Sequence, residues 1–400
     1  MATITEELTS TSAFQENLSD CALETLALHA GTSPDPTTGA MLTPIYQTTT
    51  YRQRCVGEDK GFTYSRAANP TVSALERRLA ALEGVSFATC YATGLAATTA
   101  LCLALLRSGD RVVVSEAVYG GTVRLLQKVL APFGVDAEFV DTADEECFAN
   151  ALRKPTRFVF IETPANPTLK LTDIQLASRL CKENDSVLVV DNTLLTPALQ
   201  RPFELGADVV LHSTTKFIDG HNATVGGALI TDDADLNEQF AFTRKAIGVI
   251  QSPFPAWLTL QGVKTLPLRM AQHCANASRI AEFLSRHARI PYVAYPGLES
   301  FPQYSLAKRQ QKSAGALIAF EVEGGAAAGI RLMNSVKLCS LAENLGAAET
   351  IITHPASMTH ADVPPDQRKS AGITDGLVRL SVGLESADDL IADLDQALKK

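Results

Sequence analysis

Short apolar runs alternate with longer helical stretches through the first half of the chain, and this alternation limits the possible folds most strongly. The apolar runs are mostly β-branched and lie at 87–90, 112–114, 158–161, 187–190 and 209–211. The helical stretches lie at 95–106, 122–130 and 172–182. This order predicts an α/β fold with a mainly parallel sheet that helices cover on both faces. In such folds functional residues collect at the carboxyl ends of the strands.

The residues before the first strand follow a different pattern. We expect a flexible lead over residues 1–20 and an irregular arm over 21–60 that packs on another surface, such as another subunit. A helix is expected next, because Pro70 and Thr71 are start signals and Gly84 is a stop signal.

The last third of the chain is predicted to form a smaller α+β domain. Two prolines at 252–255 indicate a boundary, followed by a helical region over 256–289, strands at 317–322 and 377–382, and a final helix from residue 387. The predicted domains are therefore an arm at 1–60, a large domain at 61–255 and a small domain at 256–400.

Composition excludes several classes of function. The chain has 400 residues, of which 46% are hydrophobic, so it can bury a full core. Its net charge of −9 is spread evenly, which argues against nucleic acid and acidic membrane surfaces as partners. No apolar run approaches the roughly 20 residues of a membrane helix, and no export signal is visible, so we expect a cytoplasmic protein. Eight scattered cysteines without a CxxC pair argue against disulfides and a zinc site.

Lys216 lies just past the predicted strand at 209–211, with Ser213 and Thr215 beside it. A partly buried lysine has a lowered pKa, and its neutral amine can attack a carbonyl to form a Schiff base. The two hydroxyl groups suit a phosphate held close to that amine. A solvent-exposed turn lysine is the alternative reading.

Four other strand ends carry polar or aromatic residues that could join Lys216. Thr93, Gly94 and Leu95 lead directly into a helix, where exposed N–H groups can bind an anion. Tyr119 follows the second strand and could stack on a flat ligand, although a core tyrosine is the commoner case.

The next two strand ends add hydrogen-bonding groups. Asn166 lies near the sheet edge with Glu162 and offers both a donor and an acceptor. Asp191 ends an apolar strand, where a carboxylate is costly to bury unless it meets a positive charge such as a protonated pyridine. A plain turn and a helix cap are the respective alternatives.

Pyridoxal 5′-phosphate requires this whole set: an amine, a carboxylate for the ring nitrogen, a stacking ring and a phosphate cup. No GxGxxG motif follows any of the strands, so a nicotinamide enzyme on a doubly wound sheet lacks its main support.

From His29 to the C-terminus the chain resembles the Cys/Met-metabolism pyridoxal-phosphate enzymes, which include cystathionine γ-synthase, cystathionine γ-lyase, methionine γ-lyase and the O-acylhomoserine sulfhydrylases. The resemblance implies fold type I of the pyridoxal-phosphate-dependent transferases and a homotetramer built from dimers with shared active sites. By this resemblance Lys216 forms the Schiff base, Asp191 pairs with the ring nitrogen, Tyr119 stacks on the ring and Asn166 bonds the ring oxygen. Arg379 binds the substrate carboxylate. The phosphate is held by Thr93, Gly94, Leu95, Ser213 and Thr215, with Tyr64 and Arg66 reaching it from a neighbouring subunit.

The resemblance implies a transferase or lyase of transsulfuration, in which Lys216 acts as general base and Tyr119 assists the leaving group. Four positions bear on the substrate. Gly121 replaces the cysteine usual in methionine γ-lyases, and Glu343 resembles the acid that cystathionine-handling members place near the distal amino group. Asn344 replaces a usual serine, and Thr63 lacks an acid found in several cystathionine enzymes, which favours a sulfhydrylase.

On balance the sequence favours γ-replacement on an O-acylhomoserine by a thiol, as in cystathionine γ-synthase. The alternatives are γ-elimination, an O-acylhomoserine sulfhydrylase and, more remotely, a non-catalytic pyridoxal-phosphate-binding protein. No metal is expected: His354 and His360 could be read as a pair of ligands, but no carboxylate or cysteine lies at ligand spacing.

Overall fold

A computed structural model describes residue 18 and residues 20–361, 363 and 365–400. The predicted lead lies almost wholly outside these residues. The described chain forms two compact units, one from residues up to 104 with 211–219 and 223–267, the other from 105–210, 220–222 and 268–400. The three-domain division remains a prediction.

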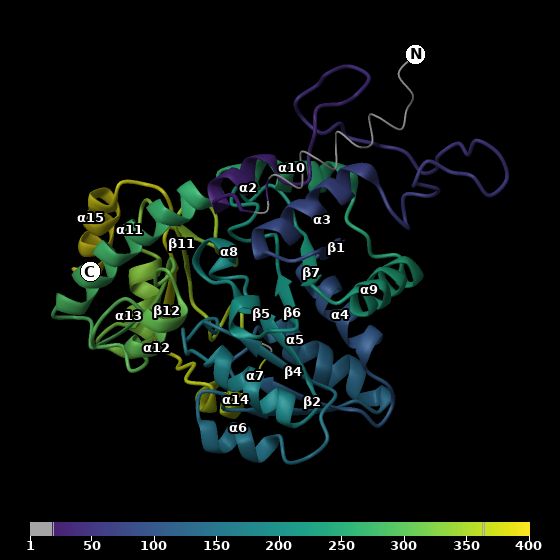
Figure 1. Ribbon diagram of the computed structural model, residues 1–400. Coiled ribbons are helices and arrows are strands. Elements are labelled where there is room, and N and C mark those ends of the chain that lie inside the picture. Colours follow the sequence, from purple (N-terminus) through teal and green to yellow (C-terminus); the bar gives the residue numbers. More distant parts are fainter. Residues whose placement is uncertain (1–17, 19, 362, 364) are drawn as a thin grey trace. The chain divides into compact units, whose positions relative to one another are not determined.

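In the first unit, strands β1 (Phe87–Tyr91) and β7 (Gly227–Thr231) pair in antiparallel register. Helices α3 (Pro70–Glu83) and α9 (Ala234–Ile247) pack on both strands (Figure 1). Helix α3 confirms the expected signals, since the Asn69 side chain accepts from the Thr71 N–H and Gly84 ends the helix in the left-handed conformation.

The arm is only partly irregular. Residues Leu23–His29 form helix α2, which we did not expect; Leu26 and Ala27 are buried on one side of it. Buried Arg78 of α3 donates to the carbonyls of Leu28 and Ala30, so it holds the end of α2. From residue 33 to 63 the chain is largely exposed and forms the extended purple loops of Figure 1. Its packing on another subunit remains a prediction.

In the second unit, four strands lie in the order β5-β4-β2-β3, and every pair is parallel. Their bounds are Arg111–Ser115 for β2, Asp136–Val140 for β3, Phe158–Glu162 for β4 and Val187–Asp191 for β5. Strands β2, β4 and β5 confirm the predicted apolar runs, as β1 does in the first unit and β6 (Val209–His212) does before Lys216. Strand β3 was missed because its residues are exposed or half-buried, which leaves no apolar run.

Two predicted helical regions differ in detail. The one over 122–130 begins earlier, as α5 (Gly120–Arg124), and continues as a π-helix over Leu125–Leu130. The one over 256–289 is two helices, α10 (Pro253–Lys264) and α11 (Leu266–Arg286), because Pro267 has no N–H to continue the hydrogen-bond ladder across Thr265.

The remaining helices lie between the strands in the chain or follow the last one. Their bounds are α4 Gly94–Leu105, α6 Glu145–Ala151, α7 Ile174–Glu183, α8 Thr196–Leu199, α12 Tyr304–Gln310, α13 Gly325–Met333, α14 Pro365–Ser370 and α15 Ala387–Leu398. Helices α4 and α7 confirm the stretches predicted at 95–106 and 172–182. No helix within the described part of the chain is long and apolar enough to cross a membrane.

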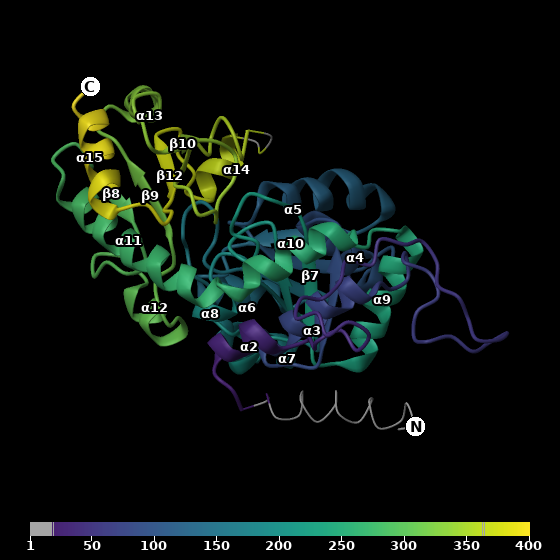
Figure 2. The same ribbon diagram turned by 90° about the horizontal axis from the view of Figure 1, so that it is seen from above.

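The second unit also holds a smaller sheet in the order β10-β11-β12-β9-β8 (Figure 2). The bounds are Tyr292–Ala294 for β8, Leu317–Glu321 for β9, Ser340–Leu341 for β10, Ile351–Thr353 for β11 and Leu377–Ser381 for β12. Strands β9 and β12 and helix α15 confirm the elements predicted at 317–322, 377–382 and from residue 387, while a separate small domain remains a prediction. Strands β8, β10 and β11 are too short to show a sequence pattern.

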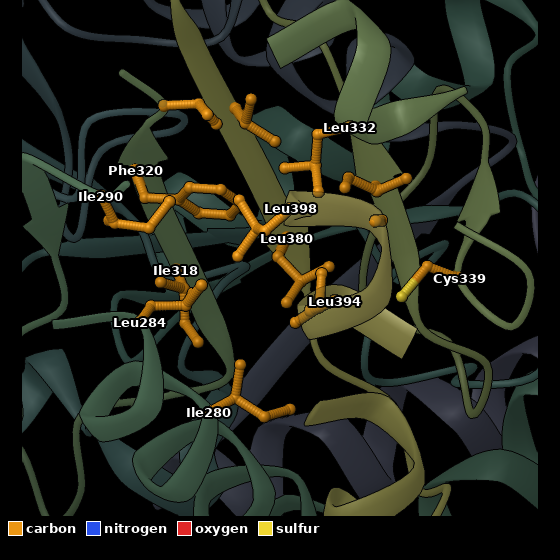
Figure 3. Close-up of a cluster of buried hydrophobic side chains, with 14 of the residues drawn as sticks. Ile280, Leu284, Ile290, Ile318, Phe320, Leu332, Cys339, Leu380, Leu394 and Leu398 are labelled. Atoms are coloured by element: carbon orange, nitrogen blue, oxygen red, sulfur yellow. The ribbon is translucent and has the colours of Figure 1, made fainter. Parts of the chain in front are cut away.

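One face of this sheet is the core of the region. Val378 and Leu380 of β12 pack with Phe320 of β9 against apolar side chains of α11, α13 and α15 (Figure 3). Because side chains alternate along a strand, Arg379 lies on the opposite face. The apolar pattern of β12 therefore directs one cation away from the core.

Candidate active site

Two carboxylates end neighbouring strands of the parallel sheet. Glu162 closes β4 and Asp191 closes β5, and the two residues are paired in register. Paired residues of adjacent strands are about 5 Å apart and point to the same face. The strands themselves are buried, so this sheet edge concentrates negative charge where water is scarce.

Glu162 is fixed by two backbone donors. One carboxylate oxygen accepts from the N–H of Tyr119 at 2.8 Å, and the other accepts from the N–H of Asn166 at 2.7 Å. Burial and the neighbouring charge of Asp191 raise the pKa of Glu162 to about 8. Asp191 is half-buried and accepts from the N–H of Thr193 at 3.0 Å.

Tyr119 is not a core tyrosine, because its side chain is 46% exposed. It lies immediately before α5, and its ring lies against Gly121: a Cβ added at Gly121 would collide with the ring. Any side chain at position 121, including cysteine, would therefore displace the ring from this position.

Arg379 is the most buried cation of this region, at 1% exposure. Its guanidinium donates to the side-chain oxygen of Asn166 at 2.9 Å, to the carbonyl of Asn344 at 2.7 Å and to the hydroxyl of Thr353 at 3.1 Å. All three acceptors are neutral, and its Nε has no partner among the described atoms. Burial lowers the pKa of Arg379 to about 10, even though the negative charge of Glu343 opposes this shift. A carboxylate ligand would satisfy this buried cation.

Glu343 and Asn344 interact with this arginine differently, the first through its charge and the second through its backbone carbonyl. Glu343 is exposed, and its charge acts on Arg379. Asn344 offers only its backbone carbonyl to Arg379, because its side-chain amide donates to Asn222 at 2.6 Å.

In the first unit, the turn between β1 and α4 meets the segment after β6. The hydroxyl of Thr93 accepts from the N–H of Ala96 at 2.9 Å, so Thr93 caps α4. A Cβ at Gly94 would lie 2.9 Å from Ser213, which shows how closely the two segments approach. Leu95 is partly exposed in the first turn. The structure thus brings together Thr93, Gly94, Leu95 and Ser213, and the helix start leaves N–H groups for an anion.

Thr215 and Lys216 follow in the same segment. The hydroxyl of Thr215 accepts from the N–H of Gly226 at 3.0 Å and contacts its carbonyl at 3.2 Å, so it ties this segment to the residue before β7. Lys216 is half-buried rather than fully exposed, and its N–H donates to the carbonyl of Ser213.

Tyr64 and Arg66 lie where the exposed arm ends. Tyr64 is 46% exposed, and the guanidinium of Arg66 is 5.6 Å from the centre of its ring. Arg66 also donates to the carbonyl of Lys245 at 2.6 Å. Their proposed role in a neighbouring subunit is not visible in a single chain.

Sequence reasoning did not assign roles to Glu162, Thr353 and His360. Glu162 carries the same signal as Asp191, an acid that ends a buried strand, and Thr353 ends the short apolar strand β11. His360 is buried, and burial together with the charges of Arg379 and Arg368 lowers its pKa to about 4.

His354 and His360, the two possible metal ligands of the sequence, have hydrogen-bond partners within the chain. Both ring nitrogens of His354 are hydrogen-bonded, to Ser357 and to the carbonyl of Asp375, and His360 bonds Thr359. Over the described ranges no group of three or more His, Cys, Asp or Glu could hold a metal ion.

The chain is similar to known proteins over most of its length. The family model for Cys/Met metabolism PLP-dependent enzymes matches residues 24–399. The chain belongs to this family. It is 45% identical to an L-methionine gamma-lyase of Fusobacterium nucleatum subsp. polymorphum, over 94% of this chain and 98% of that protein. It is also 45% identical to a cystathionine gamma-synthase of Mycobacterium bovis, over 94% and 96%.

A solved structure agrees with these relatives. Cystathionine gamma synthase from Xanthomonas oryzae pv. oryzae, in complex with aminoacrylate and cysteine, matches with a TM-score of 0.93 and 42% identity, over 95% of this chain and 98% of that one. The protein is therefore a pyridoxal-phosphate-dependent enzyme of fold type I that catalyses γ-replacement or γ-elimination on an amino-acid substrate. The resemblance, the cofactor and the enzyme class expected from the sequence are confirmed.

The residues present fit this cofactor. The adjacent carboxylates of Glu162 and Asp191 suit a protonated pyridine nitrogen, and the start of α4 suits a phosphate.

Proposed function

We propose that the protein catalyses γ-replacement on an O-acylhomoserine by a thiol, in the manner of a cystathionine γ-synthase. The observation that carries this proposal is that exposed Glu343 lies close enough to buried Arg379 for its negative charge to act on the guanidinium. The arginine suits the substrate's α-carboxylate. The glutamate suits a second, distal ammonium group, which cysteine and cystathionine possess and methionine does not.

The proposed roles follow from the chemistry of each side chain. Bound pyridoxal phosphate supplies an electron sink for the negative charge left when the substrate loses a proton. Lys216 holds the cofactor through its ε-amino group and, once released by the substrate, moves the proton from Cα. Asp191 keeps the ring nitrogen protonated. The Tyr119 hydroxyl is placed in the exposed turn before α5, where it can pass a proton to the leaving group.

The other predicted contacts belong to the same proposal. Asn166 uses its oxygen for Arg379, which leaves its side-chain N–H₂ as the donor to the ring oxygen. The phosphate is proposed to bind Thr93, Gly94, Leu95 and Ser213, with Tyr64 and Arg66 from a neighbouring subunit of a homotetramer. Thr215 can contribute only by sharing a hydroxyl that already holds Gly226.

Gly121 supports γ-replacement by a thiol over methionine cleavage. A cysteine at this position would displace the Tyr119 ring, and the glycine leaves the ring where it is. The runner-up is γ-elimination, which the similarity to an L-methionine gamma-lyase supports at equal identity.

Product analysis tests the proposal. Purified enzyme is supplied with O-acetyl- or O-succinyl-homoserine plus cysteine or sulfide, and separately with cystathionine or methionine alone. We expect thioether synthesis from the ester and cysteine. Release of 2-oxobutyrate from cystathionine without any thioether synthesis would contradict the proposal and favour the lyase.

Glu343→Gln tests whether the carboxylate of Glu343 contacts the amino group of the incoming cysteine. We expect the KM for cysteine to rise roughly 10-fold, the effect of one lost charge-assisted hydrogen bond. Activity with sulfide, which has no amino group, should stay unchanged and serves as the control. Equal effects on both thiols would rule out Glu343 as the contact for the distal amino group.

A further inference from the structure

We propose that a cavity beside helix α12 binds a free α-amino acid. This α12 cavity is lined by parts of α11, the turn at 295–297 after β8, α12 itself and residues 311–314, and its volume is about 220 Å³. The volume is below that of pockets for drug-sized ligands and suits a small metabolite. None of the residues that line it has a role in the reaction proposed above, so the inference goes beyond that function.

Gln311 is the residue that points to a ligand. It lines the α12 cavity and is only 8% exposed, yet neither its side-chain oxygen nor its N–H₂ group has a hydrogen-bond partner among the described residues. Buried polar groups nearly always have partners, and a missing partner is costly. An amide that is buried without a partner beside a cavity is therefore available to a molecule that enters the cavity.

The preceding glutamine shows the ordinary case. The side-chain oxygen of Gln310 accepts from the N–H of Ile174 at 2.9 Å, and its N–H₂ donates to the carbonyl of Thr172 at 3.2 Å. Gln310 therefore ties the end of α12 to the segment before α7. Gln311 has no such structural task for its side chain.

The main chain around Gln311 is fixed, and only its side chain is left to adapt. Its N–H donates to the carbonyl of Ala307 at 2.9 Å, and the N–H of Lys312 donates to the carbonyl of Leu199 at 2.8 Å. The terminal torsion of a glutamine has a broad energy minimum. The amide can therefore turn toward a bound ligand without a movement of the backbone.

The charges around the cavity favour an anionic group. Lys308 and Lys312 both line it, and neither forms an ion pair in the described part of the chain. The ammonium group of Lys308 lies 5.6 Å from the centre of the Tyr304 ring, a contact that leaves its charge in place. No acid occurs among the described residues that line the cavity. Two lysines without a carboxylate therefore attract one from a ligand.

The amide selects between the possible anions. The N–H₂ of Gln311 needs an acceptor and its oxygen needs a donor. An α-amino acid supplies both on adjacent atoms: its carboxylate can bind the N–H₂ group and the lysines, and its ammonium can bind the oxygen. A plain carboxylate would leave the oxygen unpaired. The apolar groups of Pro296, Ala307 and Ala314 in the cavity wall suit an aliphatic side chain.

Three variants and one control test the site. Gln311→Met keeps the length of the side chain and removes both polar atoms. Lys308→Ala and Lys312→Ala each remove one cation from the cavity. Arg309→Ala is the matched control, because Arg309 is a cation of the same helix that forms an ion pair with Asp173 instead.

Calorimetry with L-methionine counts the sites. The protein is the holoenzyme after borohydride reduction, because an amino acid can no longer displace the lysine from the reduced cofactor. We expect the wild type and Arg309→Ala to bind one more L-methionine per chain than Gln311→Met does. Lys308→Ala and Lys312→Ala should each weaken this binding roughly 10-fold, the effect of one lost charge-assisted hydrogen bond. Equal numbers of sites in the wild type and Gln311→Met would overturn the proposal.

Butyrate and butylamine test the class of ligand. Each carries only one of the two groups of an amino acid, so each should bind the wild type at least roughly 10-fold more weakly than L-methionine does. Butyrate that binds as tightly as L-methionine would overturn the assignment of an amino acid.

Thermal unfolding shows whether Gln311 has a structural role instead. Without ligand, Gln311→Met should unfold at the temperature of the wild type or above it, because the substitution removes two unpaired polar groups. L-methionine should raise the unfolding temperature of the wild type more than that of Gln311→Met. A ligand-free variant that unfolds at a lower temperature would overturn the proposal. All three measurements are independent of the reaction that the enzyme catalyses, so they stand if the proposed function fails.

Discussion

At the residue scale, burial decides what each charged side chain can do. Arg379 is almost fully buried among neutral acceptors, with an unsatisfied Nε. Glu162 and Asp191 are adjacent carboxylates at the end of two buried strands. Each arrangement favours a ligand of opposite charge. The ligand required is anionic at one site and cationic at the other, as an amino acid on pyridoxal phosphate provides.

Arg379→Lys tests whether the guanidinium of Arg379 binds the substrate carboxylate. Lysine keeps the charge but cannot bond Asn166, Asn344 and Thr353 together with a substrate carboxylate. We expect kcat/KM to fall 10- to 100-fold, about 1.5–3 kcal/mol of transition-state binding, mostly through KM. Steady-state kinetics with the amino-acid substrate measure it. A KM within twofold of the wild type would show that Arg379 does not bind the carboxylate.

At the element scale, strand ends explain which parts of the site the sequence could predict. Asp191, Asn166 and Tyr119 follow buried apolar runs, so their approach to one edge of the parallel sheet follows from the pattern alone. The surroundings of Arg379 could not be predicted, because its partner Asn166 lies 213 residues away in the chain. The same limit applies to β3, whose half-exposed residues form no apolar run.

A buried acid joins α15 to the segment before β10 and gives a pH-dependent prediction. Asp393 of α15 accepts from the N–H groups of Lys337, Leu338 and Cys339 before β10. Burial raises the pKa of Asp393, but these three N–H bonds outweigh it and the net shift is downward. The carboxylate therefore stabilises the fold above about pH 4, its ordinary range, and this stability is lost as the pH falls through the lowered value.

Asp393→Asn should lower the free energy of unfolding by about 1–2 kcal/mol at pH 7, since the new amide turns a donor toward backbone donors. The difference from wild type should shrink below pH 4. Urea unfolding at several pH values measures it, with the exposed Asp389→Asn of the same helix as control. A difference that does not change between pH 7 and pH 3 would refute the assignment.

At the scale of the whole molecule, the exposed arm bears on the proposal that a second subunit completes the site. Residues 33–63 remain largely exposed, and Tyr64 and Arg66 lie at their end. The sequence predicts an arm of this kind from its lack of a buried face, but no single chain can identify the surface that covers it. The proposal that these residues complete a neighbour's site makes the oligomer part of the catalyst.

Mixing two inactive variants tests this sharing. If Arg66 serves the neighbouring site, a mixture of Arg66→Ala and Lys216→Ala that exchanges subunits should regain about one quarter of wild-type activity, because half of the dimers are mixed and each holds one intact site. A mixture of Arg379→Ala and Lys216→Ala should regain none, since both residues serve their own subunit's site. Equal recovery in both mixtures, or none in either, would contradict the shared site.

The most direct test of the central claim is the visible absorption spectrum of the protein with pyridoxal phosphate, before and after borohydride reduction, followed by peptide mapping. We predict an absorption band from the lysine-bound cofactor in the wild type and in the exposed-lysine control Lys154→Ala, with the reduced label on the peptide that contains Lys216. Lys216→Ala should lose both the label and turnover. A label on another lysine, or full turnover without Lys216, would contradict the account.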